Sequence, residues 1–230
     1  MMSMAAIPSP VPALASWSGG KDCGLALYDV QQSGAFRVDT LLVTCTRDFD
    51  RISMHGVRNA LLDAQAARLG LQVQRVQISK GAGNDEYEAA TLAAWSGHRA
   101  RGVEHVLFGD LFLEDIRAYR DAMLGRAGMS GVYPLWKQDT HALAERFIDL
   151  GFQAVLACVD PRRLDRSFAG RAFDRALLAD LPPGVDPCGE NGEFHTFVWH
   201  GPNFAAPVDL ARGEIVERDG FVFCDLVPDV

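Results

Sequence analysis

The sequence predicts an α/β fold: a parallel sheet flanked by helices, followed by a smaller mixed α+β module at the C-terminus. Short runs rich in Val, Leu and Ile alternate with helical patterns over most of the 230 residues, and such runs are typical of parallel strands buried on both faces. This alternation indicates βαβ units, which bind ligands outside the carboxyl ends of their strands. Near residue 181 the periodicity changes, and a Pro/Gly-rich break precedes a segment of alternating apolar residues.

The elements follow in chain order. The expected strands of the first kind are Ala13–Trp17, Val38–Thr46, Gln72–Ile78, Val103–Phe108 and Phe152–Val159. Apolar residues at helical spacing predict helices around 24–32, 57–71, 116–127 and 143–150. Further on, Glu193–Trp199 alternates like a strand, and the Asp219-Gly220 pair predicts a β-hairpin over 213–226. We therefore place an α/β nucleotide-type domain over residues 1–130 and a second module over 131–230.

The composition excludes several classes of protein. The net charge is −8, and residues 131–230 carry 9 Lys and Arg against 16 Asp and Glu; this argues against a nucleic-acid partner, which needs a basic face. No apolar run is long enough for a membrane span. The first fifteen residues lack a basic region, so we expect no signal peptide and a cytoplasmic protein. Five dispersed cysteines predict free thiols and no zinc site. A homodimer is left open.

The strongest functional signal is the segment SWSGGKDC, which lies between the first strand and the first helix. Two glycines let the backbone turn tightly, and the free amides and positive dipole end of the helix suit a phosphate. The spacing excludes the G-x-x-x-x-G-K-[ST] loop. The alternative is an ordinary strand-to-helix turn. Our candidate nucleotide-binding residues here are Ser16, Ser18, Gly19, Gly20, Lys21 and Asp22, with Asp22 also able to hold a divalent cation or cap the helix.

This segment resembles the S-G-G-x-D-S pyrophosphate loop of the PP-loop ATP pyrophosphatases. The resemblance implies an enzyme that splits ATP between its α and β phosphates, usually to adenylate a substrate. Cys23 stands where the superfamily usually has Ser, and a thiol donates hydrogen bonds weakly. A thiolate would be favoured at this helix start; the alternative for Cys23 is a small, semi-buried side chain.

A second segment, from Asp186 to Val198, concentrates two carboxylates, an amide, a thiol and an imidazole around two glycines. Glu190 and Glu193 can ligate Mg²⁺ or orient an amine, and His195 can move protons near neutral pH. These three are our candidate catalytic residues. On residue chemistry alone, a Gly-Asn-Gly hairpin with a solvated acidic rim is the alternative.

This second segment, CGENGEFHTFV, resembles the hallmark segment of the diphthine–ammonia ligase family. That family is the branch of the PP-loop superfamily that amidates diphthine on elongation factor two. The resemblance extends through Ser53-Met54-His55-Gly56, Gly109-Asp110-Leu111 with Asp115 and Arg117, and Pro134-Leu135-Trp136. It implies an adenine nucleotide α-hydrolase-like, Rossmannoid PP-loop domain over 1–130 that binds ATP, and a substrate-receiving module over 131–230.

Three more candidates bind the nucleotide or its cation. Gly109 and Asp110 end a strand at its carboxyl edge, where glycine permits close approach and Asp110 can bind Mg²⁺ or substrate. His55 follows the second strand closely enough to reach an adenosine. The alternatives are a strand-ending turn and an exposed loop histidine.

Together these motifs predict an ATP-dependent, amide-forming ligase. It would transfer AMP to a carboxylate, release pyrophosphate and let ammonia displace the AMP. ATP and Mg²⁺ are the expected ligands: Lys21 and Asp22 act on the nucleotide, and Glu190, Glu193 and His195 act on the acceptor. The carboxylate substrate could be carried on a protein. The alternatives are a PP-loop enzyme acting on another small molecule or a tRNA, and a non-catalytic ATP-binding regulator.

Overall fold

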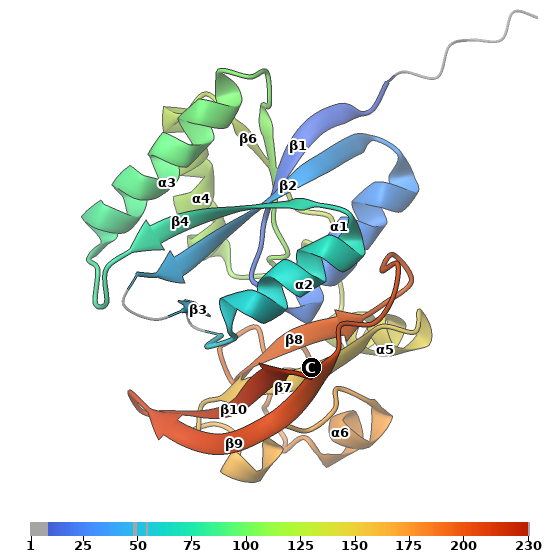
Figure 1. The fold of residues 1–230 in the computed structure, drawn as a ribbon. Coiled ribbons are helices and arrows are strands. Elements are labelled where there is room, and N and C mark those ends of the chain that lie inside the picture. Colours follow the sequence, from blue (N-terminus) through green and yellow to red (C-terminus); the bar gives the residue numbers. More distant parts are fainter. Residues whose placement is uncertain (1–8, 48–49, 54, 230) are drawn as a thin grey trace, which may run out of the picture.

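The computed structural model describes residues 9–47, 50–53 and 55–229 and contains two sheets (Figure 1). The strands of the first sheet are β1 (Val11–Ser16), β2 (Phe36–Thr46), β3 (Arg51–Ile52), β4 (Gln72–Ile78), β5 (His105–Leu107) and β6 (Ser130–Val132). Those of the second sheet are β7 (Gln153–Val159), β8 (Phe194–His200), β9 (Leu210–Arg218) and β10 (Phe221–Pro228). Residues 1–8, on which the expectation of no signal peptide partly rests, lie outside the described residues. So does Met54 of the S-M-H-G motif.

The first sheet is parallel except for β3, as the sequence predicts. Its parallel strands lie in the order β4-β2-β1-β5-β6, and the short β3 pairs antiparallel with the end of β2. The chain therefore proceeds in one direction from β1 to β4 and in the other from β5 to β6. This reversal leaves a crevice between the carboxyl ends of β1 and β5, which is where open α/β sheets bind their ligands.

Helices cover both faces of this sheet. The helices on the two faces are α1 (Lys21–Ser33) with α2 (Asn59–Leu69), and α3 (Asn84–Arg99) with α4 (Glu114–Arg126). Neighbouring strand residues point to opposite faces, so that Leu41 and Val43 join one hydrophobic cluster while Leu42 joins the other. The sequence did not predict α3, because its buried residues are Thr91, Trp95 and His98 and include no aliphatic stripe.

The second sheet corrects one prediction. Phe152–Val159 was expected to be a parallel strand, but as β7 it pairs antiparallel with both β8 and β10. Six of its seven residues are buried, and a continuous apolar run does not reveal strand direction. The predicted hairpin is confirmed: β9 and β10 join through Asp219 and Gly220, both with positive φ. The helices of this part are α5 (Thr140–Asp149) and the short α6 (Arg175–Asp180).

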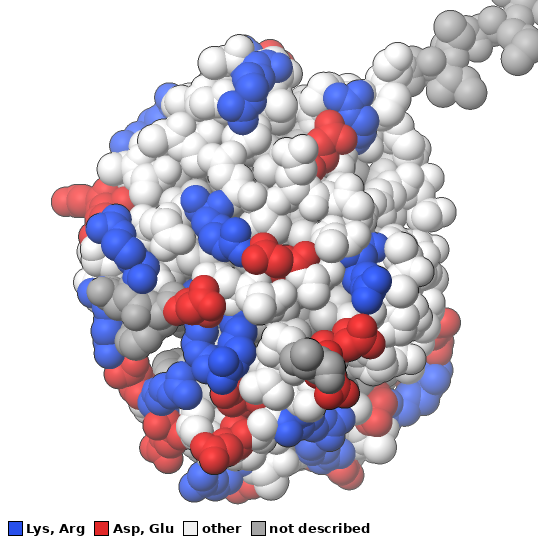
Figure 2. Space-filling model, viewed as in Figure 1, with Lys and Arg blue, Asp and Glu red and all other residues white. Residues whose placement is uncertain are grey.

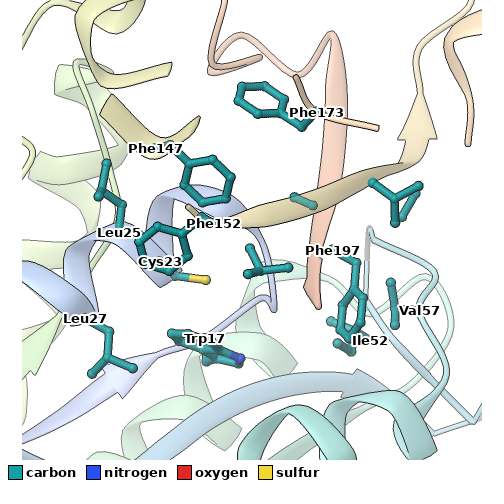
Figure 3. Close-up of a cluster of buried hydrophobic side chains, with 14 of the residues drawn as sticks. Trp17, Cys23, Leu25, Leu27, Ile52, Val57, Phe147, Phe152, Phe173 and Phe197 are labelled. Carbon is teal, nitrogen blue, oxygen red and sulfur yellow. The ribbon is translucent and has the colours of Figure 1, made fainter. Parts of the chain in front are cut away.

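One hydrophobic core joins the two sheets. Trp17, just after β1, and Cys23, at the start of α1, belong to the same buried cluster as Phe152, just before β7, and Phe197 of β8 (Figure 3). Figure 1 shows α1 and α2 between the sheets, and both helices contact second-sheet strands. The second sheet therefore fixes the position of the loop that follows β1.

The surface and the cysteines agree with the composition. On the face drawn in Figure 2, Lys and Arg side chains are interspersed with Asp and Glu and form no continuous basic stripe. Of the helices described, none combines the length and the apolar character needed to cross a bilayer. All five cysteines are buried, free thiols, as predicted.

Candidate active site

A cavity of about 510 Å³ opens at the carboxyl ends of β1, β2, β4 and β5. The loop after β1, the residues after β5 and two segments of the second module line it, so residues far apart in sequence meet there. The predicted site residues that line it are Ser16, Ser18, Gly20, Lys21, Asp22, His55, Gly109, Asp110, Glu190 and His195. Gly19 and Glu193 lie outside the lining.

The loop after β1 is held from behind by the second sheet. Gly19, with a φ of +80°, accepts hydrogen bonds at its carbonyl from the Val198 amide (2.9 Å) and from Gln65 (3.1 Å). The backbone amide of Lys21 donates to Thr196 Oγ1 at 3.0 Å. Gly19 therefore shapes the loop from its buried side, while Ser18 and Gly20 face the cavity.

Lys21 carries a charge that is already largely engaged. Its side chain is 3% exposed, and its ammonium donates to both Asp22 carboxylate oxygens (2.9 and 2.7 Å) and to the Cys188 carbonyl. Burial is the largest single influence and lowers the pKa of Lys21, but Asp22, together with Cys188 and Glu190, holds this pKa above its usual value. Lys21 thus stays protonated and links the two modules. A direct contact from Lys21 to phosphate remains a prediction.

Glu190 is an acidic side chain of the cavity with a strongly raised pKa. One carboxylate oxygen accepts a hydrogen bond from the Leu111 amide at 2.8 Å, which orients the group toward the residues after β5. Burial raises its pKa to about 7, with smaller contributions from Asp22 and Asp110. A carboxyl group with this pKa can both release and accept a proton at physiological pH.

Two histidines lie together on another wall of the cavity. The rings of His55 and His195 are 4.6 Å apart between centroids, and His55 Nδ1 donates to the Thr196 carbonyl at 3.2 Å. Burial lowers the pKa of His55 to about 3 and that of His195 to about 4, helped by His195 in the first case and by Lys21 in the second. Both rings are neutral at pH 7. The lowered pKa of His195 does not favour the expected role of moving protons near neutral pH, and a catalytic role for His195 stays a prediction.

Two models of known protein families match this chain, one in each half. The model described as the diphthamide synthase N-terminal domain matches residues 12–131, and that of the diphthamide synthase C-terminal domain matches residues 139–226. The chain belongs to the diphthamide synthase family.

Two similar proteins put this membership in context. The diphthine–ammonia ligase of Schizosaccharomyces pombe is 30% identical over 105 residues, which are 44% of this chain but only 17% of that protein. The crystal structure of a predicted subunit of tRNA methyltransferase from Methanocaldococcus jannaschii matches with a TM-score of 0.46 and 14% identity, over 84% of this chain and 98% of that one. At that similarity the match establishes neither a shared fold nor a shared function.

Glu193 does not line the cavity, in contrast to the other two candidate catalytic residues, Glu190 and His195. Its side chain is 2% exposed, and one carboxylate oxygen accepts hydrogen bonds from the Asp186 amide (3.2 Å) and from Asn191 Nδ2 (3.1 Å). The carboxylate thus ties its own loop together and does not line the cavity. Its other carboxylate oxygen is buried without a hydrogen-bond partner among the described residues. The structure thus gives Glu193 a structural role in its loop, and its catalytic role stays a prediction.

Sequence reasoning missed Gln65 and Arg120. Gln65 of α2 is fully buried, accepts from Trp17 Nε1 at 2.8 Å and donates to the Gly19 and Val198 carbonyls at 3.1 and 2.6 Å. It joins the loop after β1 to β8. Its one sequence signal is an amide on the apolar face of a helix. Arg120 of α4 lines the cavity beside Asp110; no local pattern marks it.

Cys23 and the predicted metal site complete the geometry. The Cys23 thiol donates to the Gly20 carbonyl at 3.1 Å, and burial raises its pKa, so it is a small buried side chain and not a thiolate.

Within the described parts of the chain, no three His, Cys, Asp or Glu side chains are arranged to hold a metal ion. Mg²⁺, however, commonly binds through one or two carboxylates together with substrate phosphates. Asp110 fits such an ion, because it lines the cavity and its Oδ2 is buried without a hydrogen bond. Asp22 also lines the cavity and could serve as a second ligand, although both of its carboxylate oxygens accept hydrogen bonds from Lys21.

Proposed function

We propose that this chain is an ATP-dependent ligase that adenylates a carboxylate and converts it to an amide with ammonia, on diphthine or on another acceptor. One observation carries the proposal: a strand-to-helix loop suited to phosphates and a carboxyl group with a pKa of about 7 line the same cavity. Membership of the diphthamide synthase family supports it, as does the partial match to a diphthine–ammonia ligase.

The cavity has separate surfaces for the parts of ATP. Ser16, Ser18 and the start of α1 offer hydroxyls and a positive helix end to the phosphates. Leu42, Ile52 and Ile78 form an apolar wall at the ends of the strands that suits the adenine ring. The neutral His55 lies beside that wall. ATP would then point its α-phosphate toward the crevice between β1 and β5.

The chemistry proceeds in two balanced steps. An acceptor carboxylate oxygen attacks the α-phosphorus; a P–O bond forms, the bond to the bridging oxygen of the β-phosphate breaks, and pyrophosphate leaves. Ammonia then attacks the acyl carbon, and AMP leaves with the electron pair of the acyl C–O bond. Glu190, as a carboxylate, accepts the proton that the nitrogen must lose. Mg²⁺ bound by Asp22 and Asp110 would neutralise phosphate charge.

The products of ATP turnover test this function. The protein would be incubated with ATP, Mg²⁺ and ammonium, together with diphthine-bearing elongation factor two or with small carboxylates. AMP and pyrophosphate should form in amounts equal to the amide. Formation of ADP and phosphate would contradict adenylation. ATP binding without turnover of any acceptor in this set would favour the regulator.

A further inference from the structure

Two permanently charged basic side chains, Lys21 and Arg120, line the cavity among the residues that the structure describes. Lys21 is 3% exposed and already donates to Asp22 and to the Cys188 carbonyl. ATP would bring several negative charges into a cavity that also holds carboxylates. The negative charge of bound ATP therefore needs a further positively charged partner. Arg120 is the second basic side chain of the cavity lining and can supply it.

The side chain of Arg120 is oriented but incompletely bonded. Its guanidinium carbon lies 4.6 Å from the centre of the Phe108 ring, and its Nε lies 3.0 Å from Asp110 Oδ2. The alignment of this ion pair is too poor for a hydrogen bond, so both atoms are buried without one. A guanidinium that packs against an aromatic ring is positioned by that contact, and its N–H groups remain available to an acceptor. Arg120 is thus prepared to bind an oxyanion.

The residues after β5 connect this guanidinium to the predicted phosphate loop. A Cβ atom on Gly109 would lie 2.6 Å from the Cys23 amide nitrogen and 2.7 Å from the Asp22 carbonyl carbon, so the end of β5 touches the first turn of α1. Asp110 follows directly and pairs with Arg120. Arg120 and the helix start, which favours anions, therefore line the same cavity and are linked through Gly109 and Asp110.

We propose that Arg120 contacts the phosphate chain of ATP from the α4 side of the cavity. This inference rests on the proposed function, because it requires ATP in this cavity. Arg120 would then be a second phosphate-binding group, about a hundred residues after the loop that follows β1. Arg117, one turn earlier on α4, supplies a matched control: it also stacks on aromatic rings, Tyr133 at 4.4 Å and Trp136 at 4.6 Å, but it does not line the cavity.

Calorimetry with ATP and with adenosine, in buffer containing EDTA, tests the proposal. Arg120→Ala should weaken ATP binding by about tenfold to a hundredfold, since a charge-assisted hydrogen bond is lost. Adenosine binding should be unchanged, which also shows that the site is folded. Arg117→Ala should bind both ligands like the wild type, and Arg120→Lys should lie between wild type and Arg120→Ala.

Arg120 could favour ATP binding by contacting phosphate or by neutralising the Asp110 carboxylate. The double variant Asp110→Asn with Arg120→Ala separates these two effects. A phosphate contact predicts that ATP binding stays weak in the double variant. Recovery of wild-type affinity would overturn the proposal, as would an equal loss of ATP and adenosine affinity in both single alanine variants. Wild-type protein that binds no ATP would instead contradict the proposed function itself.

Discussion

The two loops that form the cavity use charged residues in different ways. In the loop after β1, the Gly19 carbonyl, the Lys21 amide and the Lys21 ammonium are all bonded to the second module or to Asp22. In the loop from Asp186 to Glu193, Asp186 accepts from the Cys188 and Glu190 amides, and Glu193 accepts from Asp186. Glu190 alone of these acids faces the cavity. Asp186 and Glu193 accept hydrogen bonds from within their own loop and so shape it, whereas Glu190 accepts its bond from Leu111, outside the loop, and is available for chemistry in the cavity.

Replacing Glu190 by Gln should have the largest effect. Amide formation should fall by about a hundredfold, because a positioned proton acceptor contributes that much to a rate. ATP affinity should stay near that of the wild type. Turnover assays and calorimetry on the same preparation measure both quantities, and an unchanged turnover would remove the special role of Glu190.

Gln65→Met should come next. The apolar side chain leaves Trp17 Nε1 and the Val198 carbonyl without their partners. We expect the free energy of unfolding to fall by about 2 kcal/mol, the cost of buried groups left unbonded, and ATP affinity to fall because Gly19 is freed. Trp17→Phe is the control: it removes one bond, keeps the two that Gln65 donates and should leave ATP affinity intact. Weaker ATP binding in the control would mean that core packing, and not Gln65, holds the loop.

Glu193→Gln should have a smaller effect and mainly on stability. The amide oxygen can still accept from Asp186 and Asn191, so urea denaturation should show a loss of about 1 kcal/mol. Turnover should remain close to that of the wild type, in contrast to Glu190→Gln. A loss of turnover as deep as that of Glu190→Gln would restore Glu193 to the reaction.

The smallest effect should be a pH dependence of stability. The pKa of Glu190 is raised to about 7, so the stability that its neutral form contributes is present below the usual carboxyl pKa and is lost as the pH rises through 7. Because Glu190→Gln cannot ionise, it should gain about 1 kcal/mol over the wild type between pH 5 and pH 8, less than the full shift implies because the group is partly exposed. A stability difference that does not change with pH would contradict this pKa.

Local patterns allowed much of the fold and part of the site to be predicted. Four of the five parallel strands, the hairpin at Asp219-Gly220 and the glycine-rich loop are each encoded in a few consecutive residues, whereas the three-residue β6 was not predicted. What could not be predicted depends on long-range contacts: the Lys21 amide bonds to Thr196, 175 residues away. The inward turn of Glu193, the bridging role of Gln65 and the position of Arg120 arise in the same way, because each is decided by a partner that no local spacing reveals.

Carboxylate-dependent exchange of labelled pyrophosphate into ATP tests the central claim most directly. The exchange reports adenylation alone, whereas amide formation requires the step assigned to Glu190. The account predicts that Glu190→Gln keeps the exchange near the wild-type rate while amide formation is lost. An equal loss of exchange and of amide formation would contradict it, because Glu190 would then serve the nucleotide and not the incoming nitrogen.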